Sequence, residues 1–317
     1  MNKIIYLIVA VLVIGGIVMF QTGGDNTATP TVIVNYKEGE IIAQNSEYYR
    51  KFMGKNTDNF YVVQDFYSGF DTKLTNPFTL TRAEHLTRLP TTAINDSGYY
   101  ASLSIYRTFR LWTKEGDPIE ELNFMDGKVD GPAIKWYPNG QQMYQRYYKG
   151  NVPDGLWSEW YANGQLKSEG LYADNKQIGP WRIWFEDGSL TSEVFYTDGI
   201  KDGSSVVYNQ ARVKLEEGNY RQGKKQGMWH FSDQLGENSW QGEYQDDMPI
   251  GKWQWFFEDR KITEGEYQNG LKEGIWTEYD GNDNKTKEIT YRKGQKVSEK
   301  TFEKSEPEPE TEETTDL

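Results

Sequence analysis

The sequence predicts an all-β fold, an extended array of about eight antiparallel β-hairpin repeats of 24 residues that forms a twisted meander. It also predicts an N-terminal transmembrane helix and a small N-terminal cap region. Three observations predict the repeats. Glycines recur at a constant interval, aromatic residues recur at fixed distances from each glycine, and turn-forming dipeptides separate short aromatic-rich runs. A period of about 20 to 50 residues is typical of folds in which each unit buries its apolar face against its neighbours.

The repeat is defined by seven glycines that are 24 residues apart, except for a last interval of 23: Gly131, Gly155, Gly179, Gly203, Gly227, Gly251 and Gly274. When each glycine is numbered as position 0, tryptophan favours position 2 and tyrosine favours position 17. We expect these rings to form the structural core of the repeats: Trp157, Trp181, Trp229, Trp253, Trp276, Tyr148, Tyr172, Tyr196, Tyr220, Tyr244 and Tyr291. A degenerate repeat precedes them and begins at Arg107.

Turn dipeptides at positions 8 and 9 divide each repeat into two strands: Asn139–Gly140, Asn163–Gly164 and Asp187–Gly188. Such dipeptides favour type I′ turns, in which both central residues have φ above zero. A two-residue loop there places Trp157 opposite Gly170 on the neighbouring strand. An indole ring that lies across a glycine covers exposed backbone and fixes the strand register.

The string G-x-W-x-x-W-Y-x-N-G from Gly155 to Gly164, followed by Tyr172, resembles the MORN-repeat variant family, in particular its bacterial antitoxin-type branch. The resemblance covers roughly residues 107–297. It implies an elongated hairpin array that presents a surface to a partner, and the name of the branch implies neutralisation of a toxin. Two repeats depart from the pattern, because Ser205 replaces the tryptophan of position 2 and Ser232 replaces the aromatic residue of position 5.

Residues 4–20 form an uncharged apolar run that is interrupted only by Gly15 and Gly16. This length predicts a transmembrane signal anchor. Because Lys3 lies before the run and acids lie after it, the positive-inside rule makes residues 1–3 a cytoplasmic stub. The predicted location is therefore the bacterial cytoplasmic (inner) membrane, single-pass, with the C-terminal domain in the periplasm or extracellular. A cleaved signal peptide and a buried core helix are the alternatives.

The remaining segments differ in composition. Residues 21–31 are small and polar and predict a linker. Residues 32–106 predict a cap with its own small core, in which 46–53 and 81–89 could be short helices. Residues 107–297 carry the repeats, and the acidic residues 298–317 predict a disordered tail because they cannot bury a core.

The composition excludes several classes of protein. The chain has no Cys, so a disulfide framework, a thiolate nucleophile and a Cys-based metal site are impossible. Its two histidines cannot form a multi-His metal site. The net charge of −13 disfavours nucleic acid, because neutralisation of phosphates by Lys and Arg supplies most non-specific affinity. We therefore expect no cofactor, no metal and no nucleic-acid partner.

The sequence offers few candidates for chemistry. His85 beside Glu84 could act as a general base, but a surface histidine is the stronger interpretation, and His230 is better explained as a variable position on the sheet. Asp280–Asn284 begins like a calcium loop, yet Lys285 and Tyr291 stand where Gly and Glu belong, which favours a lengthened turn. We therefore expect no catalytic residue, although an enzyme within residues 32–106 remains a minor alternative.

Aromatic rings at positions 5 and 6 are the best candidates for a binding surface, because rings on both faces of a single sheet cannot all be internal. The predicted partner-binding residues are Trp136, Tyr137, Trp160, Tyr161, Trp184 and Phe185. The sequence thus predicts a non-enzymatic, membrane-anchored scaffold for protein–protein recognition outside the cytoplasmic membrane. The alternative is an aromatic platform that binds cell-wall glycan or lipid headgroups.

Overall fold

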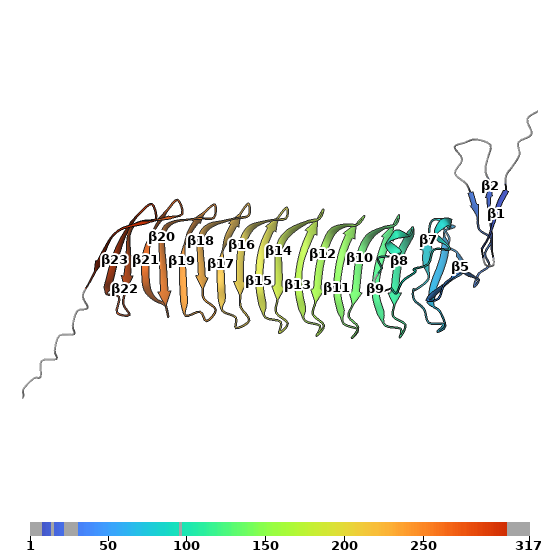
Figure 1. Cartoon of the computed structure of the whole chain (residues 1–317), viewed down its shortest axis with the longest axis horizontal. Coiled ribbons are helices and arrows are strands. Elements are labelled where there is room, and N and C mark those ends of the chain that lie inside the picture. The colour runs from blue at the N-terminus through green and yellow to red at the C-terminus, as the bar shows by residue number, and fades with distance from the viewer. Residues whose placement is uncertain (1–7, 14–15, 22–30, 95–96, 303–317) are drawn as a thin grey trace, which may run out of the picture. The chain divides into compact units, whose positions relative to one another are not determined.

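The computed structural model describes residues 8–13, 16–21, 31–94 and 97–302, and its side chains from residue 34 onward (Figure 1). Its contacts divide the chain into two compact units. The N-terminal unit comprises Met1–Lys176 with Glu186–Gly188, and the C-terminal unit comprises Gln177–Phe185 with Ser189–Leu317. We describe each unit by itself.

The predicted transmembrane helix over residues 4–20 is wrong. The described part of this segment forms strands β1 (Ile8–Val13) and β2 (Gly16–Gln21), which pair antiparallel. Strand β2 also pairs antiparallel with β3 (Thr31–Ile33). The segment is rich in β-branched residues, which favour strands. In the part of the chain that the structure describes, no helix combines the length and apolar character needed to cross a membrane. The localisation deduced from this segment stays a prediction.

Three further predictions fall wholly or partly outside the described residues. The cytoplasmic stub of residues 1–3 lies outside them, as does most of the linker of residues 21–31. The acidic tail lies outside them from residue 303 onward, whereas its first residues belong to a strand that ends at Thr301.

The cap is built from four antiparallel strands and two short 3₁₀ helices in the N-terminal unit. Its elements are β4 (Ile41–Gln44), β5 (Tyr48–Lys55), β6 (Tyr61–Tyr67), β7 (Phe78–Leu80), η1 (Ala83–His85) and η2 (Tyr100–Ser102). The helix suggested for residues 46–53 is wrong, because this segment is mostly strand β5, paired with β6. The pairing places Arg50 opposite Asp65, a cross-strand pair that the local sequence does not reveal.

A buried ion pair organises this cap. Arg50 and Asp65 are both fully buried, with Nε 2.5 Å from Oδ1. The Arg50 guanidinium also donates to the carbonyl of His85 at 3.0 Å, and the Tyr100 hydroxyl donates to Asp65 at 2.8 Å. Phe78 and Phe109 pack edge to face close by, within the main hydrophobic core. The cap therefore has its own core, which extends onto the first repeat strands.

The repeat strands of the N-terminal unit follow the cap directly. They are β8 (Ile105–Trp112), β9 (Pro118–Met125), β10 (Lys128–Trp136), β11 (Gln142–Lys149), β12 (Val152–Trp160) and β13 (Leu166–Ala173). Each pairs antiparallel with the next strand of the unit. One face of β8 to β11 carries Phe109, Leu122 and Ala133, which belong to the same core as the cap.

The C-terminal unit continues the same repeats. Its strands are β14 (Lys176–Trp184), β15 (Leu190–Thr197), β16 (Ile200–Tyr208), β17 (Lys214–Arg221), β18 (Lys224–Ser232), β19 (Asn238–Gln245), β20 (Met248–Phe257), β21 (Arg260–Gln268), β22 (Leu271–Tyr279), β23 (Lys285–Arg292) and β24 (Gln295–Thr301). Successive strands pair antiparallel in this unit too. Strands β4 to β24 confirm the β part of the predicted fold, an antiparallel meander of 21 strands.

The hairpin turns at the Asn–Gly and Asp–Gly dipeptides differ in type from those expected, whereas the Gly251 repeat, which lacks such a dipeptide, has φ above zero at both Glu258 and Asp259 of its hairpin loop. At Asn139–Gly140 only the glycine has φ above zero, at 82°. Gly140 N–H donates to the carbonyl of Tyr137, which indicates a type I turn followed by a glycine bulge. The type I′ turn closes the repeat instead, where Gly150 and Asn151 have φ of 58° and 73°. The I′ prediction for the Asn–Gly dipeptides was therefore wrong.

The strand register is nevertheless the predicted one. Trp157 pairs with Gly170, and Trp229 pairs with Gly242. In the Gly155 repeat the register shifts next to Trp160, so the bulge absorbs the extra loop residue and the remaining pairs match those of a two-residue loop.

The glycine under the indoles of Trp229, Trp253 and Trp276 belongs to the preceding repeat, not to the paired strand of the same hairpin. A Cβ atom added to Gly218 would lie 2.2 Å from Cδ2 of Trp229, and one added to Gly242 would lie 2.2 Å from Cδ2 of Trp253. No side chain fits beneath these rings. Each of these three tryptophans therefore packs flat on the backbone of the preceding repeat, whereas Trp157 pairs with Arg146 at the same position.

This contact explains why Ser205 departs from the pattern. In the preceding repeat, the position that is glycine beneath Trp229 is occupied by Val194 beneath Ser205. Val194 and Ser205 pair directly across β15 and β16. A valine side chain fills the space that an indole requires, whereas the small Ser205 fits there and is only 2% exposed. The larger valine in one strand is therefore balanced by the smaller serine in the next, so the total side-chain volume at this contact stays suitable for packing.

Candidate functional site

The predicted partner-binding rings lie where the strands of each hairpin end. Trp136 and Trp160 are the last residues of β10 and β12 in the N-terminal unit, and Trp184 is the last residue of β14 in the C-terminal unit. Tyr137, Tyr161 and Phe185 follow them as the first loop residues. All six are partly buried, so part of each side chain reaches solvent.

The second ring of each pair also closes its loop. The backbone N–H of Tyr137 donates to the carbonyl of Gln141 at 2.8 Å, and the Tyr137 carbonyl accepts from Gly140 at 2.9 Å. Its hydroxyl donates to the carbonyl of Trp160 at 2.9 Å, in the next repeat. Tyr137 thus has a structural role that the sequence did not reveal.

Asparagines join the loops side by side. The Asn139 side chain accepts from the Gln141 N–H and donates to the carbonyl of Ala162 in the next loop, at 2.7 Å. Asn163 repeats this arrangement and donates to the carbonyl of Glu186 at 2.9 Å. We call the row formed by residues 113–118, 137–141 and 161–165 the loop edge of the N-terminal unit. Its hydrogen bonds hold the loops in place, as a preformed binding surface requires.

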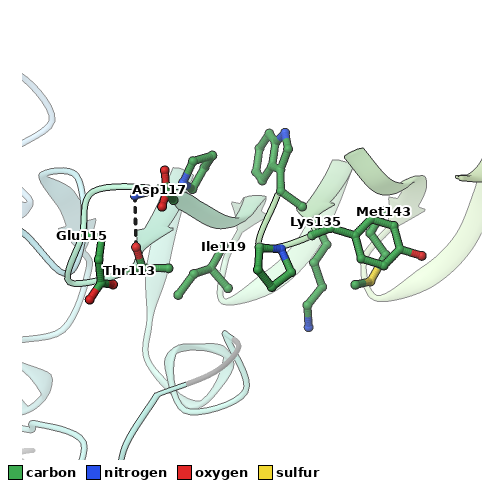
Figure 2. Close-up of a pocket in the computed structure, with 10 residues that line it drawn as sticks. Thr113, Glu115, Asp117, Ile119, Lys135 and Met143 are labelled. Atoms are coloured by element: carbon green, nitrogen blue, oxygen red, sulfur yellow. Dashed lines mark hydrogen bonds between the residues drawn. The ribbon is translucent and has the colours of Figure 1, made fainter. Parts of the chain in front are cut away.

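A cleft of about 380 Å³ opens in this loop edge between the β8–β9 loop and the β10–β11 loop (Figure 2). Its apolar lining is Pro118, Ile119, Trp136, Pro138 and Met143. The neighbouring aromatic residue one repeat earlier, Trp112, donates its indole N–H to Asn76 of the cap at 2.9 Å. The cap therefore contacts the first ring of the row, whereas Trp136 lines an open cleft.

The cleft carries charge at separate positions. Glu115 and Asp117 come from the β8–β9 loop, and Lys135 comes from β10 (Figure 2). The loop is fixed by the Thr113 hydroxyl, which accepts from the Asp117 N–H at 3.1 Å. Among the residues that the structure describes, none of these three charged groups forms an ion pair. They are thus available to a ligand.

A second group of rings lies on one sheet face of the C-terminal unit. Trp229, Trp253 and Trp276 are at most 3% exposed, which agrees with a structural role for position 2. Tyr220 and Tyr244 pack edge to face on Trp229 and Trp253, with ring centroids 5.0 and 5.2 Å apart. Lys225 lies over the Trp229 ring at 4.0 Å and covers it with its stem.

Three partly exposed rings on the same face were missed by the sequence reasoning. Phe231 stacks on Trp240 with ring planes 14° apart, and Trp255 lies 5.2 Å from Trp276. Strand alternation could have predicted two of them. Phe231 and Trp255 lie two residues after the buried tryptophans Trp229 and Trp253, and residues two apart on a strand share a face. Phe231 and Trp255 both stand at position 4 of their repeats, but no other repeat has an aromatic residue there, so a search for positions that recur throughout the array overlooked them.

The candidates for chemistry occupy structural settings. The His85 Nδ1 accepts from the backbone N–H of Ser104 at 2.9 Å, so it links η1 to the start of β8. Burial and then the nearby Arg88 hold the pKa of His85 below its ordinary value, which favours the neutral ring. His230 is exposed on β18. Asp280 accepts from the N–H groups of Asn282 and Asn284, so its carboxylate closes the turn.

Within residues 8–13, 16–21, 31–94 and 97–302, no group of three His, Asp or Glu side chains is placed so that it could hold a metal ion. The groups that the described loops and sheet faces offer to a partner are rings, backbone groups and isolated charges.

The comparisons with known proteins support this interpretation. Two segments, residues 153–174 and 177–198, match the model of the MORN repeat variant family. No curated protein matches the chain. The matched segments begin at β12 and β14 and each covers one hairpin. Together with the β-meander, they define the class of protein: a repeat scaffold that offers a surface for binding.

Proposed function

We propose that this chain is a non-enzymatic scaffold that binds a partner protein through the loop edge of its N-terminal unit. The observation that carries the proposal is the cleft beside Trp136, which combines an aromatic, largely apolar lining with unpaired charges on hydrogen-bonded loops. Partly exposed tryptophans and tyrosines on a preformed surface are the usual centres of binding energy in protein interfaces. The repeat places Trp160 and Tyr161 on the same edge, so one partner can contact two repeats.

Crosslinking in intact cells tests this proposal. The full-length protein is captured by a tag, and the captured proteins are identified by mass spectrometry. We expect one dominant partner at nearly equal amounts, and its capture should fall at least tenfold when Trp136 and Trp160 are both replaced by alanine. The control variant replaces Met228 and Ile275, which are 45% and 58% exposed, by alanine. Equal capture by both variants would reject the loop edge as the binding surface.

Neutralisation of a toxin is a narrower version of this function. It is supported by the resemblance of the repeats to the antitoxin-type branch alone. The identity of the captured protein tests it directly, because a partner whose own activity is toxic should lose that activity when it is mixed with the purified scaffold. A captured partner with no toxic activity would reject this version and leave the scaffold proposal intact.

The partly exposed rings of the C-terminal unit favour a second candidate, recognition of a glycan. Stacked faces such as those of Phe231 and Trp240 suit the flat side of a sugar ring. Soluble cell-wall oligosaccharide should then quench tryptophan fluorescence, and replacement of Trp240 by alanine should abolish the effect. No change in fluorescence at saturating sugar would remove this candidate.

A further inference from the structure

The cleft beside Trp136 is more specific than a general aromatic surface. On the basis of the proposed function, we infer that it receives an extended segment of the partner in which a lysine or arginine precedes an apolar residue. The apolar side chain packs against Trp136, Ile119 and Met143, and the cationic group lies against Glu115 and Asp117. A cleft of about 380 Å³ is close in size to small ligand pockets and can take one large side chain with its flanking backbone.

The apolar part of the inference depends on the arrangement of the lining. Pro118 and Pro138 hold rigid backbone on the two loops, and Trp136 and Met143 come from the two strands of the next hairpin. In the part of the chain that the structure describes, the Trp136 indole N–H has no hydrogen-bond partner and can donate to a backbone carbonyl of the segment. The flexible side chain of Met143 adapts to different aliphatic side chains, so this subsite selects apolar character above shape.

The electrostatic part depends on which charges remain unpaired. Arg110 lies 5.7 Å from the centroid of the Trp136 ring and already forms an ion pair with Glu121. Glu115 and Asp117 therefore keep their charge for a ligand, within a protein whose net charge is −13. This field attracts a basic segment and repels an acidic one.

Lys135 lies away from the two carboxylates in Figure 2, towards Met143. Its ammonium group can donate hydrogen bonds to the backbone carbonyls or to a following polar residue of the segment, because within the described ranges it forms no ion pair. The carboxylates lie on one side of the cleft and the ammonium group on the other, which determines how the segment is oriented. Its basic residue lies at the β8–β9 loop and its apolar residue lies over β10.

Nuclear magnetic resonance of the tryptophan side chains tests the inference on the full-length protein. Its 11 tryptophans give separate indole signals, and the Trp136→Phe variant assigns the relevant one. The probes are three short, acetylated and amidated peptides that contain lysine–leucine, glutamate–leucine or lysine–serine. We expect the Trp136 signal to shift with the lysine–leucine peptide and to shift several-fold less with the other two.

A charge variant supplies the matched control. Replacing Glu115 by Gln together with Asp117 by Asn keeps the size of both loop side chains, and it should raise the Kd of the lysine–leucine peptide about threefold to tenfold, as expected for two exposed ion pairs. The indole signal of Trp160, one repeat away, should not move. Overlaid spectra of the remaining tryptophans report whether the variant is folded.

Several outcomes overturn the inference. They are an unmoved Trp136 signal, equal responses to the lysine–leucine and glutamate–leucine peptides, or an unchanged Kd in the charge variant. These results leave the capture experiment untouched. If capture depends on Trp136 and Trp160 while the peptides fail, the protein binds a partner without this segment preference. If capture itself fails, the proposed function falls.

Discussion

At the scale of single residues, the packing of tryptophan on glycine joins one repeat to the next. The ring of Trp253 occupies the volume that any side chain at Gly242 would need. Val194 and Ser205 show that the chain also accepts the opposite arrangement, a larger residue followed by a smaller one. The pair, rather than either residue alone, is therefore the unit of stability at this contact.

This complementarity predicts a non-additive pair of substitutions. Gly242→Val should lower the free energy of unfolding by at least about 2 kcal/mol because of overpacking, and Trp253→Ser by about 3–5 kcal/mol because it empties a buried site. The double variant reproduces the natural Val194–Ser205 pair, so it should lose clearly less than the sum. Urea unfolding of the three variants measures the coupling. Additive losses would show that the valine and the indole do not compete for the same space.

At the scale of the hairpin, the glycines of the turns and the glycine at position 0 have different roles, because the position-0 glycine lies within a strand. Gly155 at position 0 has φ of 117°, and a Cβ there would lie 2.8 Å from the Cβ of Tyr147. The register shifts between Arg146 and Tyr148 on the neighbouring strand, so a bulge lies next to this glycine. Bulges bend strands and increase their twist. The position-0 glycine is thus needed for a bend rather than for a chain reversal.

One loop contains a residue that is unsuited to its conformation. Arg212 has φ of 65° in the place where other loops have glycine, such as Gly164 with φ of 87°. Arg212→Gly should raise the free energy of unfolding by about 0.5–1 kcal/mol, because a left-handed conformation costs about 1–2 kcal/mol for most residues and glycine loses more entropy on folding. Gly164→Val is the opposite control and should lower thermal stability. A lower urea midpoint for Arg212→Gly would contradict the assignment of this loop.

Glu264 links three strands and gives the C-terminal unit a dependence on pH. It accepts from Tyr279 at 2.7 Å and pairs with Lys252 and Lys261 at 2.9 and 3.0 Å. Burial alone would raise the pKa of Glu264, but these donors outweigh it and lower the pKa to about 2. Because the folded pKa lies below the unfolded one, the stabilisation is complete above about pH 4.5 and is lost as the pH falls towards 2.

The expected outcome is a flatter acid response in the Glu264→Gln variant. Thermal melts between pH 2 and 6 should show a smaller fall in melting temperature for the variant than for the unsubstituted protein, because the glutamine has no charge to lose. Glu299, which pairs with Lys296 at an exposed position, provides the control substitution. Parallel melting curves for Glu264→Gln and the unsubstituted protein would contradict the role of this carboxylate.

Elements with a repeated pattern could be predicted, and elements that depend on distant partners could not. The period, the hairpins and the register follow from the spacing of Gly155, Trp157 and Tyr172 alone. Residues 46–53 were misjudged because strand β5 is specified by pairing with β6 and by the buried Arg50–Asp65 contact. The turn type at the Asn–Gly dipeptides was misjudged because such a dipeptide suits a glycine bulge as well as a type I′ turn.

At the scale of the whole molecule, the sequence predicted the repeat fold correctly but the N-terminal membrane helix incorrectly. A count of apolar residues favoured a membrane helix over residues 4–20, but the β-branched residues of this segment favour the paired strands β1 and β2. The candidate surface was partly predictable: the sequence singled out Trp136 and Tyr137, but it could not show that loop residues 113–118 complete a cleft beside them. That contact joins two hairpins and has no local signature.

The most direct test of the central claim is photo-crosslinking from single positions in living cells. A photoreactive amino acid replaces Trp136 in one strain and Met228, an exposed residue of the C-terminal unit, in a second. The account predicts one discrete adduct with a partner protein from position 136 and none from position 228. No adduct from position 136, or the same adduct from both positions, would contradict the claim that this protein binds its partner through the loop edge.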